Sequence, residues 1–262
     1  MLGSFTGLQG PKTDMGEQLL NAAASQSIRH LFTRSESVEV TVRCYPSSKL
    51  LQGSIDSFQM RGKGLVIRKD FWVEDMMFET DAVSLDPSSV FRGQISLKQP
   101  TQSVAQVTLT EKGINDAFES ELVKRRLQNL TMAPLVNLSG GEPVSFREVQ
   151  VTLEPNNGVS IAAKTDLPNC QDVPIALTAT LGIERRRRVL FQNPQFQGDR
   201  VPESMQGISQ ILTEAFAQVL NDMVDLDRFD LDGISLRMNR LETDGKLLHF
   251  SGYAEIQHFP RI

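Results

Sequence analysis

Residues 46–109 have the sequence PSSKLLQGSIDSFQMRGKGLVIRKDFWVEDMMFETDAVSLDPSSVFRGQISLKQPTQSVAQVTL, and this stretch decides the expected fold. Its short runs of alternating apolar and polar residues, separated by Gly, Pro and Asp, are typical of half-buried strands joined by turns. We therefore expect a meandering antiparallel sheet. Gly62 and Gly64 interrupt one of its strands, which predicts a β-bulge or a sharp bend at that point.

Three segments carry a resemblance to a known family: LLQGSIDSFQMRGKGLVI at 50–67, VEDMMFETDAVSLDP at 73–87 and FRGQISLKQPTQSVAQVTLTEKGINDAF at 91–118. They resemble the LmeA-like phospholipid-binding proteins, particularly their cyanobacterial branch, over roughly residues 36–260. Glycines, a Leu-Asp-Pro triplet and a Leu-Thr-Glu helix start carry the match, so it indicates a family and not a catalytic centre. The resemblance implies an α+β, TULIP-like fold, in which a long curved antiparallel sheet wraps around one or two long helices and encloses an acyl chain.

Outside this stretch, the spacing of apolar residues predicts helices over residues 14–32, 111–130 and 204–225. The first helix is expected to pack on the sheet through one apolar stripe. The alternative is a helix that lies on a membrane surface, although its polar face carries only Glu17 and Arg29 as charges. The third helix has a wide apolar face and few charges, which indicates burial against a concave sheet.

Alternation of apolar and polar residues predicts strands over 38–44 and 173–183 and hairpins over 149–163 and 234–256. The strand over 173–183 would exceed about 30 Å at roughly 3.3 Å per residue, as a tubular lipid-binding fold would need. Two regions are expected in the chain. Residues 1–32 form an N-terminal segment and helix, and residues 33–262 form a single lipid-binding-like domain with an internal linker near 132–143.

The composition excludes several classes of protein. The 262-residue chain has 40% hydrophobic and 23% charged residues, which is ordinary for a globular protein. Its net charge of −5 gives no overall attraction for nucleic acid. No window approaches the roughly 18 to 20 consecutive apolar residues of a membrane span, and the N-terminus lacks a basic start followed by an apolar core. We therefore expect a cytoplasmic protein, peripheral on a membrane at most, without a nucleic-acid partner.

Residues that usually perform catalysis or bind metals are sparse. The three histidines, His30, His249 and His258, do not lie beside Cys or acidic residues at a spacing typical of a metal or nucleophile site. Cys44 and Cys170 are far apart in the sequence, and the expectation for them is a buried free thiol. We therefore expect no enzyme, no catalytic residue, no metal and no cofactor.

Four consecutive arginines, Arg185, Arg186, Arg187 and Arg188, follow the strand predicted over 173–183. If that strand continues, Arg185 and Arg187 share its apolar face, and the other two point to the opposite side. Guanidinium groups at the end of an apolar track suit a phosphate headgroup or an anionic membrane surface. The alternative is a solvated strand end that pairs with surface carboxylates.

Two hypotheses on function follow. In the first, the protein binds or transfers a phospholipid or similar amphiphile, and the protein contacts an anionic membrane surface only transiently. The resemblance then implies an apolar groove between the long strand and the third helix, lined by Ile175, Leu177, Leu181, Ile183, Ile208, Leu212 and Phe216. In the second, the protein is a protein–protein interaction module with a fully packed core and a basic docking patch. An apolar cavity supports the first hypothesis, and a core filled by side chains supports the second.

Overall fold

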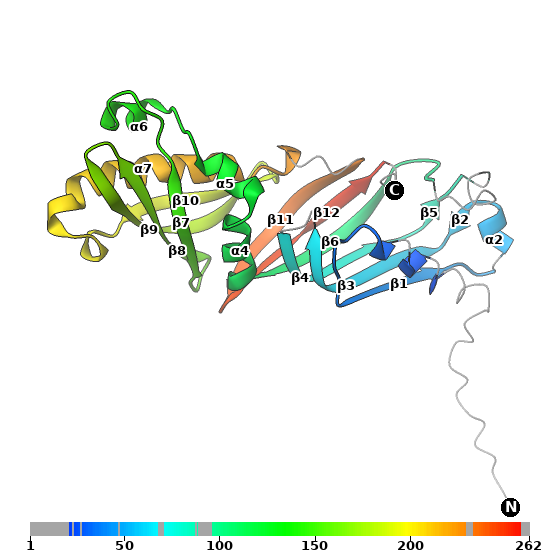
Figure 1. Ribbon diagram of the computed structural model, residues 1–262. Helices are drawn as coiled ribbons and strands as arrows, with labels where there is room; N and C mark the ends of the chain where they lie inside the picture. Colours follow the sequence, from blue (N-terminus) through cyan, green and yellow to red (C-terminus); the bar gives the residue numbers. More distant parts are fainter. Residues whose placement is uncertain are drawn as a thin grey trace, which may run out of the picture.

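The computed structural model describes residues 21–22, 24–26, 28–46, 48–67, 71–86, 88, 96–228 and 233–257. Figure 1 shows an elongated molecule with a sheet toward each end. A six-stranded antiparallel sheet forms the larger part, and a four-stranded antiparallel sheet with helix α7 (Gln206–Met223) forms the smaller part. The predicted α+β class, with a large antiparallel sheet and a long helix packed on strands, is confirmed. The long helix, however, lies on the smaller sheet.

The six-stranded sheet contains most of the stretch quoted first. Its order is β1-β3-β4-β6-β12-β11, so β3, β4 and β6 are successive neighbours, as predicted for a meander. The bounds are β1 (Ser37–Arg43), β3 (Ser57–Ile67), β4 (Phe71–Thr80), β6 (Thr101–Thr110), β11 (Ile234–Asp244) and β12 (Leu247–Ile256). At one end of this sheet, α2 (Ser48–Leu51) lies beside a two-stranded sheet of β2 (Ser54–Ile55) and β5 (Val83–Ser84).

Strand alternation gives this six-stranded sheet an apolar face and a polar face. Two rows of cross-strand partners cross the apolar face: Val40, Met60, Phe78, Ala105, Gly252 and Met238, and Val38, Gly62, Met76, Val107, Phe250 and Leu241. A row on the polar face contains Ser37, Lys63, Asp75, Thr108, His249 and Glu242. Met76 and Phe78 of β4 therefore lie on the apolar face, and Asp75 lies on the polar face.

The glycines of β3 depart from a regular strand in a different way from the predicted bulge. The pairing of β3 with β4 keeps one register on both sides of Gly64, so no extra residue is inserted between these two strands. Gly64 instead has a φ of 55°, in the left-handed region that side chains with a Cβ rarely adopt. A Cβ at Gly62 would lie 2.8 Å from Leu65 Cδ1. The bulge was wrong, and the irregularity at this position is a left-handed backbone.

A helical segment covers the outer edge of β1. Its described helical residues are 21–22, 24–26 and 28–29, and we call it the N-terminal helix. The backbone N–H of Val40 donates to Ser25 Oγ (3.0 Å), and that of Val42 donates to Asn21 Oδ1 (2.6 Å). These bonds satisfy edge donors that have no neighbouring strand. Ala24 of this helix belongs to the hydrophobic core that includes Val40, and the predicted start of the helix at 14 lies outside the described residues.

The four-stranded sheet has the order β10-β9-β8-β7 and contains both predicted elements of this region. Its strands are β7 (Phe146–Leu153), β8 (Gly158–Leu167), β9 (Cys170–Glu184) and β10 (Arg188–Phe196). Helix α7 packs on β9 and β10, and the rings of Phe216 on α7 and Phe146 on β7 have centroids 4.6 Å apart. Short 3-10 turns at Gly198–Arg200, Glu203–Met205 and Leu226–Arg228 flank α7.

Three short helices connect the two sheets in the chain: α4 (Glu111–Phe118), α5 (Glu121–Leu127) and α6 (Ala133–Leu138). The first two replace the single helix predicted over 111–130. Thr110 Oγ1 accepts from Gly113 N–H and caps the first helix, and Ser120 Oγ accepts from Val123 N–H and caps the second. Helix α6 forms inside the predicted linker, which ends with positive φ at Gly140 and Gly141.

Strand β11 joins the two sheets, because hairpin turns of the smaller sheet bind its free edge. At the β7–β8 turn, Asn157 N–H donates to Thr243 Oγ1 (2.9 Å) and Thr243 N–H donates to Asn157 Oδ1 (3.0 Å). At the β9–β10 turn, Met238 N–H donates to the carbonyl of Arg186 (2.6 Å). The edge of β11 is therefore occupied by turns and not by another strand.

Candidate functional site

The predicted groove residues lie together between β9 and α7, in the core of the smaller part. Leu177, Leu212 and Phe216 are completely buried, and the side chains of Ile175 and Leu181 are nearly so. The remaining two, Ile183 and Ile208, are half-buried at the margin of this layer. The tertiary structure thus brings the predicted lining residues of β9 into contact with those of α7. In this conformation the side chains themselves fill the layer, since all seven belong to or pack against one hydrophobic core.

Two buried hydroxyl groups lie in the same layer. Ser209 and Thr213 are one turn apart on α7, with exposed fractions of 0% and 2%, and neither Ser209 Oγ nor Thr213 Oγ1 has a hydrogen-bond partner. A buried hydroxyl without a partner destabilises the folded state by about 1–3 kcal/mol. The β9–α7 layer therefore contains polar atoms whose hydrogen-bonding capacity is unused.

The four arginines are not arranged by strand alternation. Strand β9 ends at Glu184, and Arg185 and Arg186 form a tight turn with φ values of 47° and 59°. Arg187 N–H donates to the carbonyl of Glu184 (3.1 Å), and β10 begins at Arg188. The predicted placement of Arg185 and Arg187 on one face was wrong, because the chain reverses direction between them.

Arg187 and Arg188 are held by groups of the protein itself. Arg187 pairs with Asp227 and lies 3.9 Å from Asp225 Oδ1. The hydrogen bond from Arg187 lowers the pKa of Asp227, and the bond to Asp227 raises the pKa of Arg187. Arg188 donates to Glu184 (2.9 Å) and to the carbonyl of Asn221 (2.9 Å) in the last turn of α7, where cations are favoured by the helix dipole.

Arg185 and Arg186 remain at the tip of the turn and are exposed. Within the part of the chain that the structure describes, Arg185 has neither an ion pair nor a hydrogen bond from its side chain. The guanidinium carbon of Arg186 lies 5.3 Å from the ring centroid of Tyr253, and its Nη2 donates to Asn239 Oδ1. Of the four arginines, only these two present their charge to an external partner.

The apolar face of the six-stranded sheet carries side chains that are only partly covered. Phe58, Phe78, Val107 and Phe250 are half-buried, although buried residues such as Met60 flank them. Sequence reasoning selected the β9–α7 layer as the groove and missed this surface. The aromatic residues at inward positions were the available signal for this second surface.

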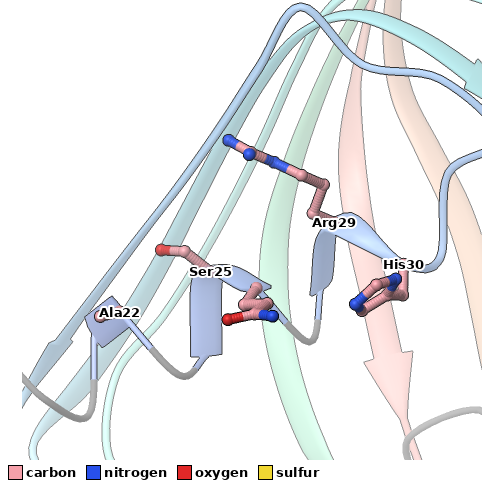
Figure 2. A pocket seen from close by; sticks show the side chains of 5 residues that line it. Ala22, Ser25, Arg29 and His30 are labelled. Atoms are coloured by element: carbon pink, nitrogen blue, oxygen red, sulfur yellow. The ribbon is translucent and has the colours of Figure 1, made fainter.

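A pocket of about 330 Å³ adjoins the N-terminal helix and is lined by Ala22, Ser25, Gln26, Arg29 and His30. Figure 2 shows Ser25, Arg29 and His30 projecting from this segment, with strands of the six-stranded sheet behind it. Four of the five lining residues have polar side chains, and none of the five is acidic. Sequence reasoning missed this pocket; two adjacent basic residues at the end of an otherwise weakly charged helix were the signal.

A second recess, of about 230 Å³, lies on the polar face of β6, β11 and β12. Its polar lining includes His249, whose Nδ1 lies 3.0 Å from Thr108 Oγ1, and an Arg240–Glu242 ion pair (2.5 Å). The charges of this ion pair compensate each other. This recess therefore lacks the unpaired basic groups found beside the N-terminal helix.

Comparison with known families identifies one match. The model of a family described as LmeA-like phospholipid-binding matches residues 12–252. The chain belongs to the LmeA-like phospholipid-binding family. The match covers nearly the whole chain and begins before residue 36, where the resemblance in the sequence was expected to start. No curated protein and no solved structure matches the chain.

In this LmeA-like protein, the described residues contain no group of three or more His, Cys, Asp or Glu side chains that could hold a metal ion. Cys44 is buried and donates to the carbonyl of Ser54 (3.3 Å), whereas Cys170 is half-buried, and neither forms a disulfide within the described residues. Among the described helices, none is long and apolar enough to span a membrane.

Proposed function

We propose that this protein binds the acyl chains of a phospholipid or similar amphiphile on the apolar face of the six-stranded sheet and carries the lipid without catalysing a reaction. The observation that supports this most directly is that the apolar face, although partly buried, leaves a set of side chains half-exposed: Phe58, Phe78, Val107 and Phe250. Exposed apolar patches on a folded protein commonly mark a binding surface. An acyl chain laid on this face removes that surface from water.

The magnitude of the hydrophobic effect favours such a ligand. Removing apolar surface from water contributes roughly 25 cal/mol per Å², or about 0.8 kcal/mol for each buried CH₂ group. A chain of a dozen or more carbons that contacts the rows around Phe78 and Phe250 therefore gains several kcal/mol. The polar face of the same sheet is less suited to an acyl chain, because charged side chains such as Lys63, Asp75 and Glu242 lie in its cross-strand row.

The predicted groove between β9 and α7 is the second place proposed for an acyl chain. Entry there requires α7 to move away from β9, because Leu177, Leu212 and Phe216 now fill the layer. The unpaired hydroxyls of Ser209 and Thr213 support this location, since ester oxygens of a lipid would accept their hydrogen bonds. The filled layer, conversely, agrees with the packed core of the protein–protein interaction alternative.

Arg185 and Arg186 are proposed as a docking point for an anionic membrane from which lipid is taken or to which it is delivered. Basic residues near an anionic bilayer contribute on the order of 1 kcal/mol each, so two give weak and reversible docking. Arg187 and Arg188 add to the local positive potential, but Asp225, Asp227 and Glu184 compensate their charge.

Two pairs of cross-strand neighbours on β6 and β12 give a matched test of the sheet surface. Val107 and Phe250 are partners on the apolar face, whereas Val104 and Tyr253 are partners on the polar face, with exposed fractions of 45% and 43%.

Protein is purified without detergent, and the lipid in its organic extract is quantified by mass spectrometry. Val107→Gln/Phe250→Gln is expected to lower the lipid retained per mole at least about threefold, because amide groups on this face disfavour acyl contact.

The Val104→Gln/Tyr253→Gln variant is the control, and it is expected to retain lipid at the wild-type level. Thermal unfolding of both variants establishes that they are folded. Equal lipid content in the two variants would exclude the sheet surface as the binding site. If the wild type contains no lipid and takes up no fluorescent phospholipid, lipid binding itself is excluded and the protein-interaction alternative stands.

A further inference from the structure

We infer that the pocket beside the N-terminal helix binds a phosphate group, and that in the lipid-loaded protein this group is the phosphate of the lipid headgroup. The second part rests on the proposed lipid-binding function. The pocket is distinct from the arginine turn, which lies at the junction with the smaller sheet, and from the β9–α7 layer.

The chemistry of the lining suits an anion. Arg29 offers a planar guanidinium, Gln26 an amide N–H₂, Ser25 a hydroxyl and His30 a ring nitrogen, and none of the lining residues that the structure describes carries a carboxylate. Arg29 forms no ion pair with any residue that the structure describes, and its side chain is exposed. An unpaired guanidinium binds phosphate oxygens through two parallel hydrogen bonds, so a phosphate would complete this arrangement.

The position of the pocket suits an amphiphile. The N-terminal helix turns Ala24 and Ile28 toward the hydrophobic core, where Ala24 is only 4% exposed, and it lies beside β1 at the edge of the apolar face. The adjacent side of the same helix, with Ala22 and Arg29, lines the pocket (Figure 2). A phosphate held there therefore lies at the border between the apolar face and water, which is where the headgroup of a chain bound to that face must be.

The volume agrees with a headgroup and excludes a whole lipid. About 330 Å³ is at the lower end of the range for small-molecule pockets, roughly 300–1,000 Å³. A phosphate with a small substituent fits this space, whereas two acyl chains do not. The chains of the same molecule must then lie on the neighbouring apolar surface.

The alternative explanation for Arg29 and His30 is local. Cations near the C-terminal end of a helix are favoured by the helix dipole, so both residues would stabilise the N-terminal helix without any ligand. This explanation predicts a lower melting temperature on their removal and no change in ligand binding. The experiment therefore measures lipid preference and phosphate binding together with thermal stability.

Delipidated protein is incubated with vesicles that contain equal amounts of phosphatidylglycerol and of diacylglycerol with the same acyl chains, and the lipid retained after re-isolation is measured by mass spectrometry. The wild type is expected to retain about ten times more phosphatidylglycerol than diacylglycerol. The reason is that charge-assisted hydrogen bonds to the phosphate raise the affinity by at least one order of magnitude. Arg29→Gln/His30→Gln is expected to reduce this ratio to near one. Arg61→Gln, which removes an exposed arginine from β3, is the control and is expected to keep the wild-type ratio.

Binding of inorganic phosphate to the same delipidated proteins is followed by ³¹P NMR. Loss of phosphate binding in the double variant with an unchanged lipid ratio would assign the pocket to free phosphate and overturn the headgroup assignment. Wild-type values for both measurements in the double variant would overturn the phosphate site altogether. If the wild type retains neither lipid, the proposed lipid-binding function fails, while the phosphate titration still decides whether the pocket binds an anion.

Discussion

The backbone N–H of Met238 donates to the carbonyl of Arg186 at 2.6 Å, and this bond ties the outermost strand of one sheet to a hairpin turn of the other. β11 has no further strand beyond it, so its outward N–H groups need other acceptors. Arg186 also donates from its side chain to Asn239, the residue left unpaired where the β11–β12 register shifts. The backbone of the arginine turn therefore holds the two sheets together, while the guanidinium groups of Arg185 and Arg186 stay exposed to solvent.

The register shift in β11 makes Gly252 the position most sensitive to added volume. A Cβ there would overlap the carbonyl oxygen of Arg237 and lie 2.8 Å from its carbonyl carbon, and backbone atoms cannot move aside as a side chain can. We expect Gly252→Ala to destabilise the protein by about 2 kcal/mol or more in urea denaturation. Gly207→Ala is the control, because no atom lies within 4 Å of a Cβ there, and it should be neutral or stabilising. Equal stability of the two variants would contradict the close approach at β11.

Pairwise replacement of the arginines should separate docking from architecture. Arg185→Ser/Arg186→Ser is expected to leave the melting temperature close to that of the wild type and to lower flotation with anionic liposomes about tenfold or more. Arg187→Ser/Arg188→Ser is expected to lower the melting temperature, because it removes the partners of Asp227 and of the last turn of α7. Equal flotation of wild type and the first variant would remove the membrane role of the turn.

The Arg187–Asp227 pair predicts a dependence of stability on pH. Arg187, and then Arg237, lower the pKa of Asp227 in the folded state, so this carboxylate contributes stability above its unfolded pKa of about 3.9 and loses that contribution as the pH falls further. Asp227→Asn should therefore be less stable than the wild type at pH 6. The difference should shrink below about pH 4. Urea denaturation at pH 6 and pH 3 measures it, and a constant difference would show that the ionised form of Asp227 is unimportant.

Removal of the unpaired hydroxyls of α7 tests their effect on both stability and lipid retention. Ser209→Ala and Thr213→Val delete buried polar atoms that lack partners, so each should increase the free energy of unfolding by up to about 1 kcal/mol. If ester oxygens of a lipid normally accept these hydrogen bonds, the same variants should also retain less lipid. Lower stability of delipidated Ser209→Ala would indicate that its hydroxyl has a partner within the protein.

Local elements were predictable because they depend on neighbours in the sequence. The Asn156-Asn157 turn, the β9 strand and helix α7 formed where alternation or helical spacing placed them, and Asn156 and Asn157 adopt the positive φ that these residues tolerate. The break between α4 and α5 was less visible. Ser120 supplies an N-cap in the middle of a continuous apolar pattern, and the pattern alone does not show that a second helix starts there.

Local patterns did not predict the arrangement of the four arginines. The facing prediction required β9 to continue through the arginines. The run at 185–188 contains no Gly or Pro that would have indicated the turn made by Arg185 and Arg186. Apart from Glu184, the acceptors that hold Arg187 and Arg188 lie 40 and 33 residues later in the chain, at Asp227 and at Asn221 in α7. Which charges stay free is therefore a property of long-range pairing.

By itself, the sequence determined the α+β class, the meander of β3, β4 and β6 and the two faces of each strand, because side-chain alternation and turn residues act over a few positions. It also carried the family resemblance. Only the tertiary structure decided that the strands divide into two sheets joined at β11, that α7 fills its layer on β9, and that Arg187 pairs with Asp227 while Arg185 stays exposed. These features depend on contacts between distant segments, and a local pattern contains no information about which distant surface will cover it.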